Sequence, residues 1–126
     1  PNTAAEGWMF RRFLKAGIAI AGVDVGESYG SPQGRATYNA LHAHLVNGTP
    51  RFQPKASLLA RSRGGLMLYN WAADNPEKVT CIAGIYPVCD LRSYPGIARA
   101  CGAYGIRKKQ LSNRAASRPK STWTPQ

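Results

Sequence analysis

The sequence has little negative charge, few cysteines and no long apolar run. Its six acidic residues all lie at or before Asp90, whereas 17 lysines and arginines bring the net charge to +11. No apolar stretch approaches the ~18 residues of a membrane-spanning helix, so no membrane partner is expected. No secretory signal is visible, and the start at Pro1 suggests a processed or excerpted chain. At 126 residues, 44% of them hydrophobic, the chain is expected to form one small globular domain.

The three cysteines, Cys81, Cys89 and Cys101, lack the C-x-x-C spacing of a metal site. Their small, odd number also does not fit a disulfide framework, so we expect reduced, structural cysteines. That pattern favours the cytoplasm without fixing the compartment. The only histidines, His42 and His44, are two positions apart and therefore face different sides of a helix. The sequence predicts no metal and no cofactor.

Basic residues dominate the chain after Asp90. They are Arg92, Arg99, Arg107, Lys108, Lys109, Arg114, Arg118 and Lys120, with no acid among them. A solvated cationic tail is the favoured interpretation. The alternative is weak attachment to a polyanion through counterion release. No known nucleic-acid motif accompanies the charge, so no specific nucleic-acid partner is predicted.

Helical and strand patterns alternate along the chain. Helical spacing marks residues 3–16, 35–46 and 64–74, and apolar runs at 18–23, 56–60 and 79–86 predict strands. This order indicates an α/β fold, a minimal three-layer arrangement in which helices flank a three-stranded parallel sheet. We expect a core over residues 1–97, then a basic region over 98–126 with weak helical character up to about residue 114.

Ser62 lies where a strand pattern changes into a helical pattern. Ala60 two positions before it and Gly64 two positions after it give the small-x-Ser-x-small spacing of a nucleophile elbow, with alanine in the first small position. Because such a serine occupies a strained turn, we expect no room for bulk at either flanking position. The helix that follows would offer N–H groups to an oxyanion. The alternative is that Ser62 only forms a strand–helix turn.

Two loops follow predicted strands and are expected at the same sheet edge as Ser62. In parallel sheets, such loops form the walls of ligand sites. Glu27, Ser28 and Tyr29 are therefore candidate substrate-binding residues, although a purely turn-forming role for this loop is equally open. Asp90 follows the strand after the elbow helix. His42 and His44 lie late in their helix, so we expect both near the opposite edge.

Four segments resemble the α/β-hydrolase superfamily, most closely esterase- and prolyl-oligopeptidase-like bacterial hydrolases with a Gly-x-Ser-Arg-Gly-Gly elbow. They are residues 20–30, 61–66, 70–79 and 86–90, within a region of about residues 6–96. The resemblance implies that Ser62 is the nucleophile and that the Arg63 N–H is an oxyanion donor. Some glucuronoyl esterases have a Ser-Arg pair at this place, which implies a charge-assisted contact from the Arg63 guanidinium. Pairing of Arg63 with Asp90 or Glu27 is an equally weighted alternative.

The resemblance also implies a truncated hydrolase core. Family strands carrying the second oxyanion donor would precede Pro1, and the usual triad acid and histidine would follow Gln126. Asp90 stands where some lipases carry the acid. His42 or His44 could act as base only through a rearranged fold or a second subunit.

The sequence thus leads to a serine hydrolase of small carboxylic esters, weak because a serine without a base is a poor nucleophile. The second hypothesis is a non-catalytic hydrolase remnant that self-associates through exposed sheet edges. Homo-oligomers are expected in either case. The third is a basic polyanion-binding protein.

Overall fold

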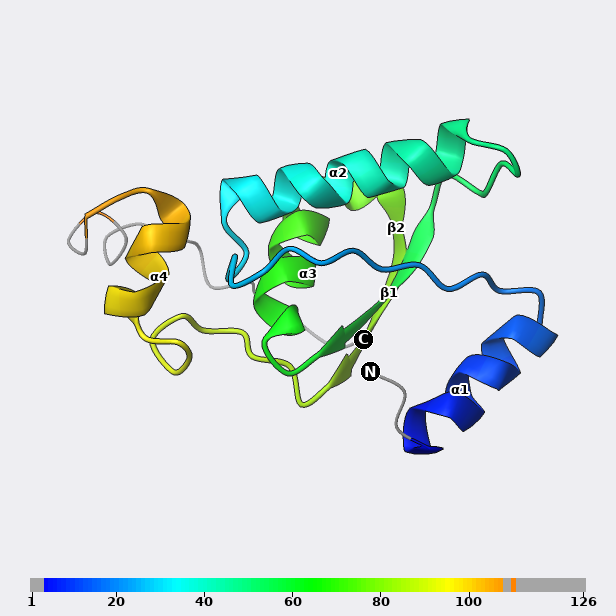
Figure 1. Ribbon diagram of the computed structural model, residues 1–126, viewed down its shortest axis with the longest axis horizontal. Coiled ribbons are helices and arrows are strands. Elements are labelled where there is room, and N and C mark those ends of the chain that lie inside the picture. The colour runs from blue at the N-terminus through cyan, green and yellow to red at the C-terminus, as the bar shows by residue number, and fades with distance from the viewer. Residues whose placement is uncertain (1–3, 108–109, 111–126) are drawn as a thin grey trace, which may run out of the picture.

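The computed structural model describes residues 4–107 and 110, and the structural findings concern these residues. The elements are α1 (Ala4–Lys15), α2 (Pro32–Asn47), β1 (Ala56–Arg61), α3 (Gly64–Asp74), the 3₁₀ turn η1 (Pro76–Lys78), β2 (Val79–Ile85) and α4 (Ile97–Tyr104) (Figure 1). The mixed α/β class is confirmed. α4 ends at Tyr104, where Gly105 adopts φ 61°. Of the stretch up to about residue 114 that was expected to have weak helical character, residues 108, 109 and 111–114 lie outside the described residues. Of the basic tail, Lys108, Lys109 and residues 111–126 lie outside the described residues.

Within the part of the chain that the structure describes, the sheet contains two parallel strands instead of the predicted three. β1 and β2 pair in register, with Leu58 opposite Ile82 and Ala60 opposite Gly84, and α3 forms the crossover between them. Residues 18–23 form no strand but an exposed segment that crosses in front of α3 and the sheet in Figure 1. Ile18 is 52% exposed and Ile20 43% exposed. Of the other members of this run, only Val23 is large, and the rest are alanine and glycine, so the run offers little apolar surface to hold it against β1.

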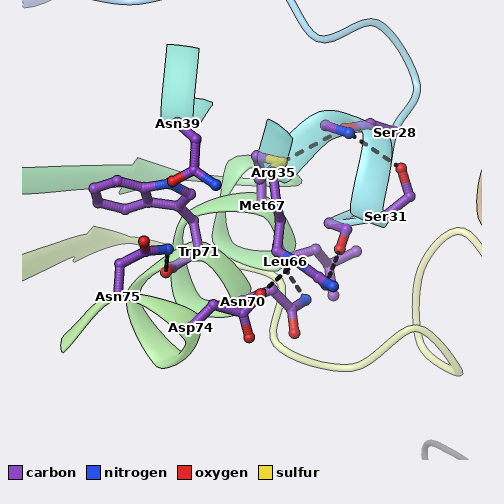
Figure 2. A network of polar contacts seen from close by, with 12 residues as sticks. Ser28, Ser31, Arg35, Asn39, Leu66, Met67, Asn70, Trp71, Asp74 and Asn75 are labelled. Carbon is purple, nitrogen blue, oxygen red and sulfur yellow. Dashed lines mark hydrogen bonds and ion pairs between the residues drawn. The ribbon is translucent and has the colours of Figure 1, made fainter. Parts of the chain in front are cut away.

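α2 packs on α3 through a seam that combines one large aromatic side chain with polar contacts (Figure 2). Trp71 is only 2% exposed, and its indole N–H donates to Oδ1 of Asn39 at 3.0 Å. Nε of Arg35 lies 2.6 Å from Oδ2 of Asp74, and a second nitrogen of Arg35 donates to the Gly30 carbonyl. These contacts tie the start and the middle of α2 to the last turns of α3.

α2 begins three residues earlier than the sequence pattern predicts. The Ser31 hydroxyl accepts from the Gly34 N–H at 3.4 Å, and Pro32 occupies the first turn, where its missing N–H costs nothing. Just before this cap, Gly30 has φ 78°, and a Cβ on it would overlap the carbonyl oxygen of Leu66. Only glycine therefore lets the loop approach α3 so closely. The loop that enters α2 is held against α3.

Much of the sheet is uncovered. β2 is exposed from Thr80 to Gly84, and within the described residues neither outer edge of the sheet pairs with another strand. The hydrophobic residues that are buried outright are few: Tyr29, Ala60, Leu66, Met67, Leu68, Trp71 and Ala100. Cys81, Cys89 and Cys101 are free thiols. The core is small and lies between the helices and β1.

None of the described helices combines the length and apolar character needed to cross a membrane.

The turn from β1 into α3 is tightly packed at one glycine and open at its neighbour. Ala60 is fully buried, as expected. A Cβ on Gly65 would overlap the carbonyl oxygen of Val88 and lie 2.8 Å from Cβ of Pro87, whereas a Cβ on Gly64 would meet nothing within 4 Å. The prediction that Gly64 must lack bulk is therefore wrong. The residue that must lack a side chain is Gly65, one position later, because Gly65 is the residue of the first helical turn that faces the loop after β2.

Gly65→Ala and Gly64→Ala form a matched pair that tests this packing. We expect Gly65→Ala to lower the free energy of unfolding by about 1–3 kcal/mol, since the obstructing atoms belong to backbone and proline. Gly64→Ala should leave stability unchanged or raise it by up to about 1 kcal/mol, because alanine favours the helix. Urea unfolding of both variants measures the difference. Equal losses in the two variants would contradict the contact with Val88.

Candidate functional site

Ser62 adopts a left-handed backbone conformation at the carboxyl end of β1. Its φ is 48°, which is unfavourable for a residue with a Cβ. Three backbone hydrogen bonds hold it: its N–H donates to the Ile85 carbonyl at 3.1 Å, and its own carbonyl accepts from Val88 at 2.8 Å and from Gly65 at 3.0 Å. The strained turn is therefore fixed by the end of β2, by the loop after β2 and by the start of α3. This is the backbone geometry of a strand–serine–helix elbow.

The side chain of Ser62 is exposed, and no acceptor or base among the described residues is hydrogen-bonded to its hydroxyl. The N–H of the following residue, Arg63, likewise donates to none of the described carbonyls. It precedes the first turn of α3, where the helix dipole is positive. One backbone N–H without an acceptor among the described carbonyls is thus available beside the serine.

An open depression of ≈630 Å³ adjoins the elbow. Its lining comes from the loop before α2, the start of α3, the loop after β2 and α4, and consists of Glu27, Tyr29, Arg63, Tyr94, Arg99 and Ala103. Three of the residues singled out from the sequence, Glu27, Tyr29 and Arg63, are therefore brought together. Ser62 precedes Arg63 in the chain but is not itself a lining residue.

Arg63 pairs with Glu27, one of the two carboxylates that the sequence offered for it. Both side chains are more than half exposed, so this pair contributes little to folding stability. A hydrogen bond with Tyr94, together with the charge of Glu27, raises the pKa of Arg63. A hydrogen bond to the Glu27 carboxylate raises the pKa of the Tyr29 phenol. Glu27 thus pairs with Arg63 and lies close enough to Tyr29 to raise the pKa of that phenol.

Ser28, predicted beside Glu27 and Tyr29 as a substrate-binding residue, lies elsewhere. It is only 8% exposed, and its hydroxyl lies 3.6 Å from Sδ of Met67 on α3 (Figure 2). The side chain packs between the loop and the helix because a Cβ-free Gly34 leaves room for it. The turn-forming alternative therefore describes Ser28, while Glu27 and Tyr29 face the depression.

Asp90 is engaged by its own loop and not by Arg63. Its carboxylate accepts from the backbone N–H of Arg92 at 2.8 Å and forms an ion pair with that guanidinium at 2.8 Å. These hydrogen bonds hold the pKa of Asp90 below its usual value. The Asp90 carbonyl also accepts from the Ser93 hydroxyl at 2.8 Å. In this conformation Asp90 stabilises a turn after β2, without a described contact to Ser62 or to a histidine.

The two histidines are not at the elbow. Nε2 of His42 lies 2.8 Å from the carbonyl oxygen of Pro54, which precedes β1, and its ring packs on Trp71 with centroids 5.8 Å apart. Ser62 follows the other end of β1, so at ~3.3 Å per strand residue the strand separates the two by on the order of 20 Å. His44 is exposed on α2. The sequence-based expectation that both lie away from Ser62 agrees with this arrangement.

Sequence reasoning missed Tyr94, Arg99 and Ala103 as lining residues. Tyr94 lies in the loop after β2, which was expected at the same edge, so its position carried a usable signal. Arg99 was grouped with the cationic tail, although it belongs to α4 and faces the depression. What could not be predicted is that α4 folds back to this edge, where Tyr104 donates a hydrogen bond to the Tyr29 carbonyl at 3.0 Å.

Within residues 4–107 and 110, no group of three or more histidine, cysteine or acidic side chains is placed to hold a metal ion. The depression offers instead a guanidinium–carboxylate pair, a second guanidinium and two phenols. This set suits recognition of a small polar ligand.

In comparisons with known proteins, the chain matches no protein-family model, and no curated protein or solved structure is significantly similar to it. The hydrolase resemblance of the four sequence segments therefore rests on those segments alone.

Proposed function

We propose that this chain is a serine hydrolase that cleaves small carboxylic esters with Ser62 as nucleophile. The observation that carries the proposal is the left-handed backbone of an exposed serine, at φ 48°, on a strand–helix turn. A non-glycine residue in this conformation costs on the order of 1–3 kcal/mol, and such strain concentrates at functional sites. The adjoining depression of ≈630 Å³ is large enough for a small ester.

The chemistry follows from the groups present. Oγ of Ser62 attacks the ester carbonyl carbon, and the N–H of Arg63 faces the oxygen that becomes negative. Collapse of the tetrahedral intermediate breaks the bond to the alcohol, which leaves with a proton, and the acyl group stays on Ser62. Water then attacks this acyl-serine and releases the carboxylic acid. Because no described imidazole reaches Ser62, its proton passes to solvent base, and turnover is slow.

The nucleophile is tested with a fluorophosphonate probe and a p-nitrophenyl ester. We expect the probe to lose fluoride and add to Ser62, visible by intact mass and peptide mapping. Ser62→Ala should lose the label and lower ester turnover at least about tenfold, since without the nucleophile only oxyanion donors and binding remain. Ser57→Ala is the matched control, because Ser57 is also exposed but lies within β1. Wild-type turnover in Ser62→Ala would disprove the proposal.

The pH dependence tests the absence of a histidine base. The quantity to measure is the ester turnover of the wild type minus that of Ser62→Ala. We expect it to rise about tenfold per pH unit between pH 6 and 8, because each unit raises the hydroxide concentration tenfold. A plateau above about pH 6.5 would contradict this route. It would instead identify a histidine, and loss of the plateau in His42→Ala or His44→Ala would show which one a second subunit supplies.

A second candidate function is self-association through the sheet. It is favoured by the exposed stretch of β2 and by the two unpaired outer edges of the described sheet. Unpaired edges of this kind template pairing with another chain. Ile82, in the middle of β2, is 38% exposed and gives the uncovered strand an apolar contact point.

Ile82→Lys tests this association. We expect the wild-type mass from light scattering to rise with protein concentration, and the variant to weaken association about tenfold, since a lysine would be buried unpaired. Ala43→Lys, on the exposed surface of α2, adds the same charge elsewhere and should leave association unchanged. A concentration-independent monomer mass in the wild type would rule this function out.

A further inference from the structure

The depression beside Ser62 carries one positive charge that the described residues do not neutralise. Its three charged lining residues are Glu27, Arg63 and Arg99. Glu27 forms its ion pair with Arg63. Arg99 is exposed on α4, and no described carboxylate pairs with its guanidinium. The guanidinium of Arg99 is thus the group on this surface that remains available to an anionic ligand.

Two phenols lie next to this guanidinium. The rings of Tyr29 and Tyr94 pack edge to face, with centroids 6.2 Å apart and planes at 73°. The pKa of Tyr29 is raised, chiefly by its hydrogen bond to Glu27, while the charge of Arg99 acts in the opposite direction. Arg99 is therefore within electrostatic range of the Tyr29 hydroxyl. A ligand at this place meets aromatic surface and a cation together.

We infer that the depression binds a free carboxylate at Arg99, so that the esters presented to Ser62 are half-esters that keep a second, ionised carboxyl group. A guanidinium matches a carboxylate with two parallel hydrogen bonds, and its attraction acts over several ångströms before contact. Glu27 opposes binding at the other side, where it already occupies Arg63. The site therefore favours one carboxylate, placed at the α4 side.

This inference rests on the proposed function for its substrate class, but its binding site can be measured without turnover. Benzoate serves as the probe and neutral benzamide as its isosteric control, with binding followed by NMR titration at low salt. We expect wild type to bind benzoate at least about fivefold more tightly than benzamide, the order expected for one partly exposed ion pair.

Three variants that each change one charge test whether benzoate binds at Arg99. Arg99→Gln should weaken benzoate binding about fivefold and leave benzamide binding unchanged. Arg51→Gln, an exposed arginine in the segment before β1 and away from the depression, removes the same charge and should change little. Glu27→Gln removes the lining carboxylate and should strengthen benzoate binding. This gain keeps the test decisive even if Arg99→Gln is poorly folded.

Equal affinities of wild type for benzoate and benzamide would overturn the carboxylate site, and so would equal losses in Arg99→Gln and Arg51→Gln. The Ser62→Ala variant separates the two proposals, because it should bind benzoate like wild type. A chain that binds benzoate through Arg99 but has no Ser62-dependent turnover keeps the site and loses the hydrolase. Ser62-dependent turnover that is equal for neutral esters and half-esters keeps the hydrolase and overturns the substrate class inferred here.

Discussion

The burial of Trp71 between α3 and α2 is the contact on which the rest of the site depends. It is the largest fully buried side chain among the described residues, and its indole N–H is satisfied by Asn39. With α2 fixed in this way, the loop that enters it is drawn against α3 at Gly30. That loop carries Glu27 and Tyr29 to the start of α3, where Arg63 stands. An aromatic contact in the middle of two helices thus determines which polar groups meet at the sheet edge.

The elbow and the chemistry expected of it are separate in this molecule. The strained serine depends only on backbone: the carbonyl of Ile85, the N–H of Val88 and the N–H of Gly65. The proton transfer that usually accompanies such a serine depends on a histidine side chain, and His42 is engaged at the opposite end of β1. The elbow geometry of Ser62 is therefore present without a described histidine beside it. The described groups around the depression are suited to binding a polar ligand, and none of them is an imidazole that could take a proton from Ser62.

The sequence predicted most of the fold that depends on local pattern. The limits of α3, the start of β1 and the length of β2 were close to their observed positions, because apolar spacing and the glycine and proline stops act over a few residues. The third strand at residues 18–23 was wrong: the segment stays exposed although the outer edges of the described sheet are unpaired, and an apolar run carries no information about whether its segment packs against a sheet. Gly64 and Gly65 could not be distinguished for the same reason: only the position of Val88 decides which must remain glycine.

For the candidate site, too, the sequence predicted which loops meet but not how every side chain is oriented. Glu27, Tyr29 and Arg63 were named because loops after strands gather at one edge, and the structure brings them together. Ser28 and Asp90 were named by the same rule, but one side chain turned inward and the other bound Arg92. Ser28 thus packs against α3, whereas its neighbours Glu27 and Tyr29 line the depression. Arg99 was not named, because its role depends on where α4 packs.

The exposed segment after α1 also separates α1 from the rest of the molecule, so the two parts differ in how strongly they are held in the folded state. Glu6 of α1 forms an ion pair with Arg61 at the end of β1, but no strand or helix ladder joins α1 to the sheet. One carboxylate oxygen of Glu6 is buried without a hydrogen-bond partner, which reduces what that contact gains. α1 can therefore separate from the body in a local opening that leaves β1, α3 and β2 paired. The elbow does not depend on the first helix for its shape.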